Sequence, residues 1–184
     1  MAYDKNIFNN LLWVNQRSPF TFSRLWGNDD ITNIKKLLDT IPLISKGGVN
    51  FKNFEFDKST QKPFDLIHRK VQHCNKNTYN FELNTYLEHK YLEYSGENTP
   101  NFHLGIGPDL YNQRKLTYII HLNDPSEYEG GELQLFLNYD KIFRVPNEKG
   151  TMVLFPSFIL HKITPLTKGT KEVTMGFVGG KPFK

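Results

Sequence analysis

Hydrophobic residues are spaced as in helices up to about residue 78. In residues 27–41, the apolar side chains recur every three or four positions, and Asn28 to Asp30 offer a helix cap. Residues 62–74 repeat this spacing, with Pro63 suited to a first helical turn. The pattern predicts two amphipathic helices in the first third of the chain.

After residue 78 the spacing changes to short apolar and aromatic runs. They are bounded by Gly, Pro, Asn or Asp, which is typical of strands, and span residues 79–83, 85–94, 115–122, 132–136, 151–157 and 172–180. No helix-length stretch separates them, so we expect a mainly antiparallel sheet. We predict an α+β fold with one domain over 1–184. A jelly roll, or double-stranded β-helix, over 78–184 is supported by helices within 1–77.

Composition narrows the class of protein. The 184 residues include 38% hydrophobic and 14% aromatic residues, enough to build a core. The net charge of +4 permits an anionic substrate, but the lysines are scattered, so we expect no nucleic-acid partner. The single Cys74 fits a reducing compartment. Without a long apolar run or an apolar leader, the sequence predicts a cytoplasmic protein with no membrane partner.

Three polar residues stand out against the predicted strands. His103 precedes a glycine loop, His161 follows an apolar run, and Lys171 begins the last strand. Two imidazoles from separate strands suit iron(II), zinc or copper(II), and a buried cation suits a carboxylate. Taken alone, each residue also fits an ordinary structural role, His103 as a strand histidine and Lys171 as a lysine at a strand start.

The segments around these residues resemble the iron(II)- and 2-oxoglutarate-dependent oxygenases, in particular their prolyl-hydroxylase-like branch. The resemblance covers roughly half of the chain, with order and spacing kept. It rests on the segments YNFEL, FHLGIG, RKLTYIIHLNDPSEYEGGELQLF, GTMVLFPSFILHKITPLTKGTKEV and GFVGGKPF. The N-terminal third resembles the helical support of this family only in outline.

The resemblance implies a site. His103 and His161 match the family's two iron-binding histidines, and Lys171 falls where a basic residue, usually Arg, pairs with the far carboxylate of 2-oxoglutarate. His121 and Thr117, which share one face of their strand, and Tyr94 match positions near this cosubstrate. Dioxygen would be the second cosubstrate. The substrate would be a small molecule or a peptidyl residue, and the oligomeric state is open.

Position 105 departs from the family. Its iron-binding Asp falls on Gly105, which offers no ligand and, we expect, leaves a void. The family's halogenases have Ala or Gly here and bind chloride to the iron, so a halogenase with His103, Gly105 and His161 at its centre is our first expectation.

Two alternatives stay open. Asp109, in the flexible GPD loop, would replace the missing carboxylate in a hydroxylase, or the site would be degenerate and the protein a binding module. Arg114 and Lys115 are expected to be a solvated pair near the entrance.

Overall fold

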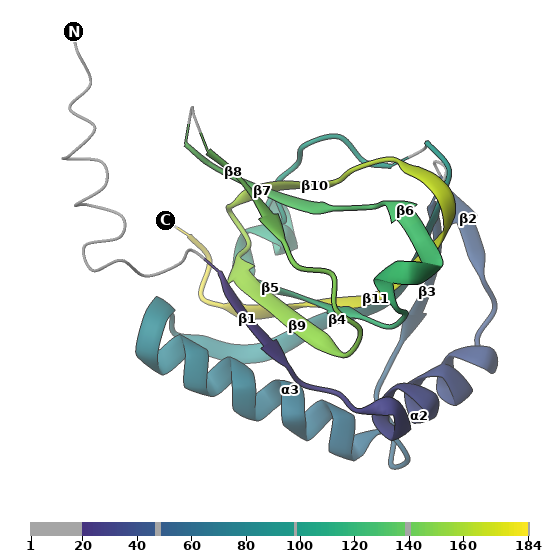
Figure 1. Ribbon diagram of the computed structural model, residues 1–184. Helices are drawn as coiled ribbons and strands as arrows, with labels where there is room; N and C mark the ends of the chain where they lie inside the picture. The colour runs from purple at the N-terminus through teal and green to yellow at the C-terminus, as the bar shows by residue number, and fades with distance from the viewer. Residues whose placement is uncertain (1–19, 47–48, 98, 139–140, 184) are drawn as a thin grey trace, which may run out of the picture.

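The computed structural model describes residues 20–46, 49–97, 99–138 and 141–183. Two β-sheets face each other, and two helices cover the outer face of the larger one (Figure 1). Every strand pair in the described residues is antiparallel. This is the double-stranded β-helix predicted from the sequence.

The larger sheet has eight strands among the described residues. Seven follow the order β1, β9, β5, β11, β4, β3, β2, and β6 pairs with the first part of β11. Their bounds are Thr21–Arg24 (β1), Ile44–Lys46 (β2), Val49–Phe54 (β3), Leu83–Ser95 (β4), Arg114–His121 (β5), Tyr128–Gly130 (β6), Thr151–Pro156 (β9) and Leu166–Gly180 (β11). The smaller sheet has the order β10, β7, β8. Its strands are Leu133–Asn138 (β7), Lys141–Val145 (β8) and Leu160–Ile163 (β10).

The helices are α2 (Asn28–Asp39) and α3 (Gln61–Cys74), and three short helical turns complete the fold. These turns are Asn75–Tyr79 (η1), Asp109–Gln113 (η2) and Pro125–Glu127 (η3). The backbone N–H of Gly27, which caps α2, donates to the Asp30 carboxylate over 3.1 Å. No helix in the described part of the chain is long and apolar enough to cross a membrane.

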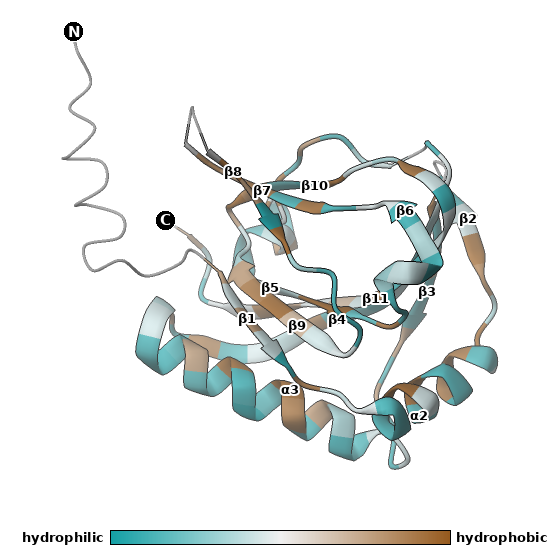
Figure 2. Ribbon diagram, viewed as in Figure 1, coloured by the Kyte–Doolittle hydropathy of each residue, from teal (hydrophilic) through white to brown (hydrophobic). Residues whose placement is uncertain are grey.

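The fold has two cores, one on each face of the larger sheet. On the helix side, Ile34 of α2 and Ile67 of α3 pack against Tyr118 and Ile120 of β5. Between the sheets, Ile119 packs with Leu135 and Phe155. Figure 2 shows the consequence: β5 and β9 are largely apolar, while each helix alternates between apolar and polar faces. The alternation predicted for β5 is confirmed, because its odd and even positions enter different cores.

The first third of the chain is less helical than expected. Besides α2 and α3 it contributes β1, β2 and β3, of which β3 extends the sheet beside β4. The strand predicted over residues 79–83 is also absent before Leu83, where β4 begins. Tyr79 ends the turn η1, and Asn80 has a left-handed backbone (φ 55°). Residues 1–19, which the expected helical support includes, lie outside the described residues.

Candidate active site

The exposed His103 and the buried His161 of β10 come together as a backbone bridge. Each backbone N–H donates to the other residue's carbonyl, over 3.0 Å from His103 and 2.9 Å from His161. Their ring centroids are 4.4 Å apart, and the Phe155 ring lies 4.9 Å from the ring of His161. This reciprocal backbone pair brings the side chains of residues 58 positions apart to one place, as the sequence predicted.

The ring orientations leave a matching nitrogen on each histidine. Nδ1 of His103 faces the carbonyl of Asn101 at 2.9 Å, and Nδ1 of His161 faces that of Ile159 at 2.8 Å. A carbonyl only accepts, so each Nδ1 carries a proton, and Nε2 is the ring nitrogen that a neutral imidazole would offer to a metal. Burial lowers the pKa of His161 to about 4, which keeps that ring neutral. Neutral imidazoles oriented by a carbonyl are the form in which histidine binds metals.

Lys171 lies fully buried in β11 between the sheets. Its ammonium donates to the carbonyl of Gly131 over 2.5 Å and to Oδ1 of Asn147 over 2.9 Å. Burial lowers its pKa to about 7, with a smaller opposing effect from Glu132. Tyr94 of β4 is the register partner of Lys171, so the two side chains share a face. An ammonium has three N–H groups, so one is left for a ligand.

Polar atoms without partners surround this lysine. Both ring nitrogens of His121 and the hydroxyl of Tyr128 are buried without a hydrogen bond in the described structure. The Tyr128 ring lies 5.5 Å from the Lys171 nitrogen. Burial and the nearby Lys171 charge lower the pKa of His121 to about 3, so its ring is neutral. Unpaired buried donors are costly, and a carboxylate would satisfy them together with Lys171.

Gly105 lies beside the Ser157 carbonyl and the Thr117 hydroxyl rather than beside a void. A Cβ at this position would be 3.0 Å from both the Ser157 carbonyl and Oγ1 of Thr117, and 3.3 Å from the Phe177 ring. Thr117 and Ser157 are hydrogen-bonded to each other over 2.9 Å. The expected void beside Gly105 is therefore absent. A side chain at this position would already meet these neighbours at its Cβ. Thr117 lies at this end of the site, away from the His121 end of β5.

No group of three histidine, cysteine or carboxylate side chains gathers as a metal site within the described ranges. Asp109 is exposed at the start of η2, with a left-handed backbone (φ 55°). In this conformation it does not join the two histidines. The residues present therefore fit a metal bound by two imidazoles, with its other positions left to non-protein ligands.

Arg114 and Lys115 are not the solvated pair expected from the sequence. Their exposed fractions are 9% and 7%. The guanidinium of Arg114 stacks on Phe177, and the ammonium of Lys115 lies 3.2 Å from the ring centroid of Phe183. Adjacent cations suggested solvation, but aromatic side chains from β11 and the C-terminal end cover both.

Sequence reasoning did not identify Tyr128 and Asn147 as part of the Lys171 pocket. Tyr128 belongs to the short strand β6, and Asn147 lies in the turn between β8 and β9. Asn147 gives no signal in the sequence, because its position depends on how the β8–β9 turn folds.

Comparison with known proteins identifies the family of the chain. The family profile of the 2OG-Fe(II) oxygenase superfamily matches residues 73–179, more than half of the chain. A PKHD-type hydroxylase of Thermosynechococcus vestitus is 34% identical over 84 residues, covering 45% of this chain and 36% of the relative. The chain spans about a third of the length of the curated relatives it matches.

Solved structures share the fold at low sequence identity. A prolyl-4-hydroxylase of Pseudomonas putida has a TM-score of 0.74 at 14% identity, covering 96% of this chain and 98% of that one. A prolyl hydroxylase of Trichoplax adhaerens, in complex with a hypoxia inducible factor peptide fragment, has a TM-score of 0.72 at 15% identity, covering 95% and 89%. These likenesses show the fold.

Proposed function

The chain belongs to the 2OG-Fe(II) oxygenase superfamily, and we propose that it hydroxylates an unactivated C–H bond with iron(II), 2-oxoglutarate and dioxygen as cofactor and cosubstrates. When bound, they supply oxygen activation, in which 2-oxoglutarate becomes succinate and carbon dioxide and one oxygen atom enters the substrate. The observation that carries the proposal is the pairing of two metal-oriented imidazoles with a buried, partly unsatisfied cationic pocket.

Each residue of the pocket has a role in this proposal. His103 and His161 hold iron through Nε2, the atoms that their carbonyl contacts leave free. Lys171 offers its remaining N–H to the far carboxylate of 2-oxoglutarate, and His121, through its one N–H, and Tyr128, through its hydroxyl, donate to the same group. Tyr94 and Thr117 line the pocket at its two ends. Phe155 excludes water beside His161.

Hydroxylation is favoured over halogenation for two reasons. The curated relatives are hydroxylases by name, and the space next to Gly105 holds the Thr117 and Ser157 oxygens rather than an opening for a halide. The third protein ligand would be absent or would be Asp109 after a rearrangement of its loop. Halogenation with bound chloride is the second candidate, supported by the lack of any side-chain ligand at residue 105.

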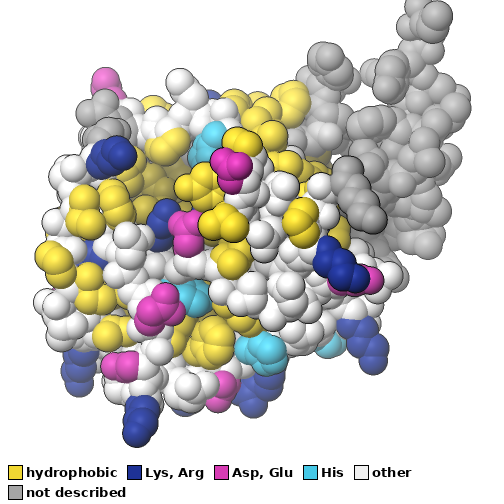
Figure 3. All heavy atoms as spheres, turned by 180° about the vertical axis from the view of Figure 1, so that it is seen from behind, with side chains coloured by type: hydrophobic (Ala, Val, Ile, Leu, Met, Phe, Trp, Pro, Cys, Tyr) yellow, Lys and Arg dark blue, Asp and Glu magenta, His cyan; other side chains and the backbone are white. Residues whose placement is uncertain are grey.

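A peptidyl substrate is the class we propose. The structurally similar Trichoplax enzyme is described with a peptide fragment. Exposed apolar side chains come from segments that adjoin the two histidines or Arg114 and Lys115 in the chain or in space: Leu104, Tyr111, Phe158 and Phe183. Phe158 and Phe183 contact each other at 6.2 Å between ring centroids, and the Phe183 N–H donates to Asn112. Figure 3 shows that apolar side chains gather widely on the face behind the view of Figure 1. Such a surface suits an extended chain better than a small polar metabolite.

The test is succinate formation from 2-oxoglutarate by the purified protein with iron(II) and a peptide library. His161→Ala should lower the rate at least about 100-fold, since it removes one of two protein ligands. His73→Ala, at an exposed position of α3, is the control and should keep full activity. No succinate from the unchanged protein would favour the binding module.

Product analysis with and without chloride separates the two reactions. A product heavier by one oxygen atom under both conditions supports hydroxylation. A chlorinated product that requires chloride would replace that proposal with halogenation.

A further inference from the structure

Gly105 is held in place only by its peptide groups, because it has no side chain. Its N–H donates to the Ser157 carbonyl over 2.8 Å, and its carbonyl accepts from Nη1 of Arg114 over 3.1 Å. Residue 105 follows His103 by two positions. The way in which this carbonyl is held therefore determines how the chain leaves the first histidine.

Arg114 meets the Gly105 carbonyl from a packed environment. Its guanidinium lies 3.6 Å from the ring centroid of Phe177 and 4.2 Å from that of Tyr111, on β11 and η2. Nη2 donates to the carboxylate of Glu88 on β4. A planar guanidinium with rings against it and two bonded nitrogens has little freedom to turn. Arg114 thus joins the segment after His103 to β4, η2 and β11.

Glu88 is placed for this contact by an unusual backbone. Its φ is 46°, in the left-handed region, where β4 and β11 lose register between Gly176 and Phe177. Its carboxylate also accepts from Lys90 over 2.7 Å. Burial alone would raise the pKa of Glu88, but the bonds from Lys90 and Arg114 outweigh it and lower the pKa. A non-glycine residue in this conformation is costly and persists where the surroundings fix it.

We propose that Arg114, oriented by Glu88, is a positioning residue that holds the His103–Gly105 segment so that His103 faces His161. The hydrogen bonds of Arg114 to Gly105 and Glu88 rest on the structure alone. Their consequence for iron binding rests on the proposed function. Arg114 touches neither histidine, so it acts through the Gly105 carbonyl. Without it, Gly105 would keep the hydrogen bond from its N–H to the Ser157 carbonyl, and His103 would keep its backbone pair with His161, but the His103 ring would sample orientations that do not face the His161 ring.

A purely structural role for Arg114 predicts a different result. If Arg114 only stabilised the fold, its loss would affect the site no more than an equal loss of stability elsewhere. Ile67→Val, in the helix-side core, provides that comparison. Lys90→Met provides a second control, since it removes the other cation from Glu88 and leaves the Arg114 contact in place.

The experiment measures hydrogen exchange of the Gly105 amide in the metal-free protein and anaerobic iron(II) binding with 2-oxoglutarate. Arg114→Lys should speed Gly105 exchange and weaken iron(II) binding, each about tenfold, because a lysine cannot span both partners. Glu88→Gln should show a smaller effect in the same direction and serves if Arg114→Lys does not fold. Lys90→Met and Ile67→Val should leave both quantities near those of the unchanged protein.

Unchanged hydrogen exchange of the Gly105 amide in Arg114→Lys and Glu88→Gln would overturn the proposal that Arg114 holds this segment. An equal increase of the exchange rate in Ile67→Val would also overturn it. Faster exchange without weaker iron(II) binding would overturn the role in positioning His103. If the unchanged protein bound no iron(II), the proposed function would fail, while the exchange measurement would still decide whether Arg114 holds the segment.

Discussion

Lys171 shows at the scale of one residue how burial prepares a ligand site. Its ammonium has exchanged water for the Gly131 carbonyl and the Asn147 amide oxygen, and burial lowers its pKa to about 7. The titratable side chains around it are the neutral His121 and the hydroxyls of Tyr94 and Tyr128, with Glu132 acting more weakly. A bound dicarboxylate would add the missing negative charge and favour the protonated lysine.

Binding of 2-oxoglutarate should therefore take up a proton above pH 7. In the free protein Lys171 is largely neutral at pH 8, and in the complex it is charged. The affinity should fall as pH rises above about 7, approaching tenfold per pH unit. Calorimetry at pH 8 in buffers of different ionisation enthalpy measures the uptake, which we expect to approach one proton. Equal affinity at pH 6.5 and 8.5 would show that Lys171 is already charged without the ligand.

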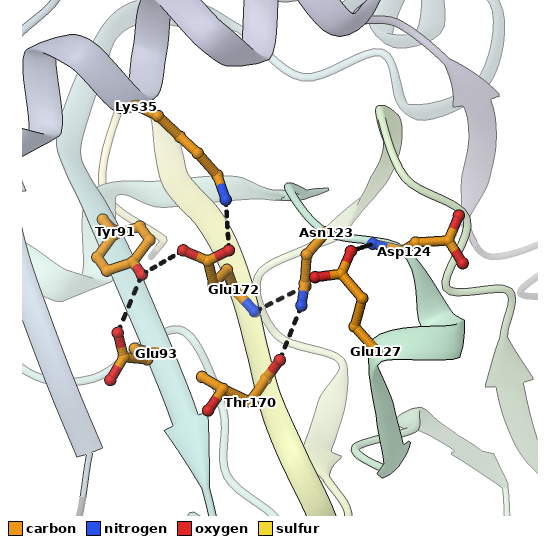
Figure 4. A network of polar contacts seen from close by, with 8 residues as sticks. All are labelled: Lys35, Tyr91, Glu93, Asn123, Asp124, Glu127, Thr170 and Glu172. Atoms are coloured by element: carbon orange, nitrogen blue, oxygen red, sulfur yellow. Dashed lines mark hydrogen bonds and ion pairs between the residues drawn. The ribbon is translucent and has the colours of Figure 1, made fainter.

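At the scale of elements, β11 is held on both sides of Lys171. Asn123 donates to the Thr170 carbonyl over 2.7 Å and accepts from the Glu172 N–H over 3.0 Å, as Figure 4 shows. The Glu172 side chain accepts from Lys35 of α2 over 2.5 Å and from Tyr91 of β4 over 2.8 Å. The buried amide of Asn123 thus supports the strand that carries the lysine, and Glu172 ties that strand to a helix.

The two parts of this network should differ in energy. Asn123→Ala leaves two backbone groups beside Lys171 without partners and should cost about 1–3 kcal/mol. Lys35→Met breaks an ion pair whose lysine is 41% exposed and should cost less than about 1 kcal/mol. Urea denaturation of both variants measures the difference. Equal costs would contradict the assigned role of Asn123.

Long, strongly patterned elements were predictable from the sequence, and short ones were not. Helices α2 and α3 show an apolar face, and β5 and β9 are apolar runs with clear ends. Strand β2 is three residues long and exposed, so no alternation marks it. Strand β3 follows only from its pairing with β4. The same limit applies to the site: His103 and His161 lie in recognisable motifs, whereas Arg114 gains its role from contacts with Glu88 and Phe177, which are distant in the sequence.

At the scale of the whole molecule, the larger sheet separates a structural histidine from the proposed metal histidines. His89 of β4 lies in the helix-side core, where it hydrogen-bonds Tyr118 over 2.5 Å and contacts the ring of Phe56. Burial lowers its pKa to about 4, so the ring is neutral in the folded protein. His89 therefore has a structural role in this core.

Burial of neutral histidines makes the fold sensitive to acid. Between pH 6.5, the ordinary pKa of histidine, and about pH 4, His89 binds a proton in the unfolded chain but stays neutral in the folded protein. The unfolding free energy should therefore fall as pH drops through this range, by about 1.4 kcal/mol per pH unit for His89. His89→Phe should reduce the slope by that amount in urea denaturation of the metal-free protein. An unchanged slope would mean that His89 is protonated in the fold.

The most direct test of the account is anaerobic titration of the protein with iron(II) and then 2-oxoglutarate, followed by visible absorption. We predict a charge-transfer band that saturates at one iron per chain and is lost in His161→Ala. In Lys171→Met the band should appear only at a 2-oxoglutarate concentration well above the one that the unchanged protein needs. This result would establish that the two histidines and the buried lysine form one site. No band from the unchanged protein, or an equal band from His161→Ala, would contradict the assignment of this pocket as an iron(II) and 2-oxoglutarate site.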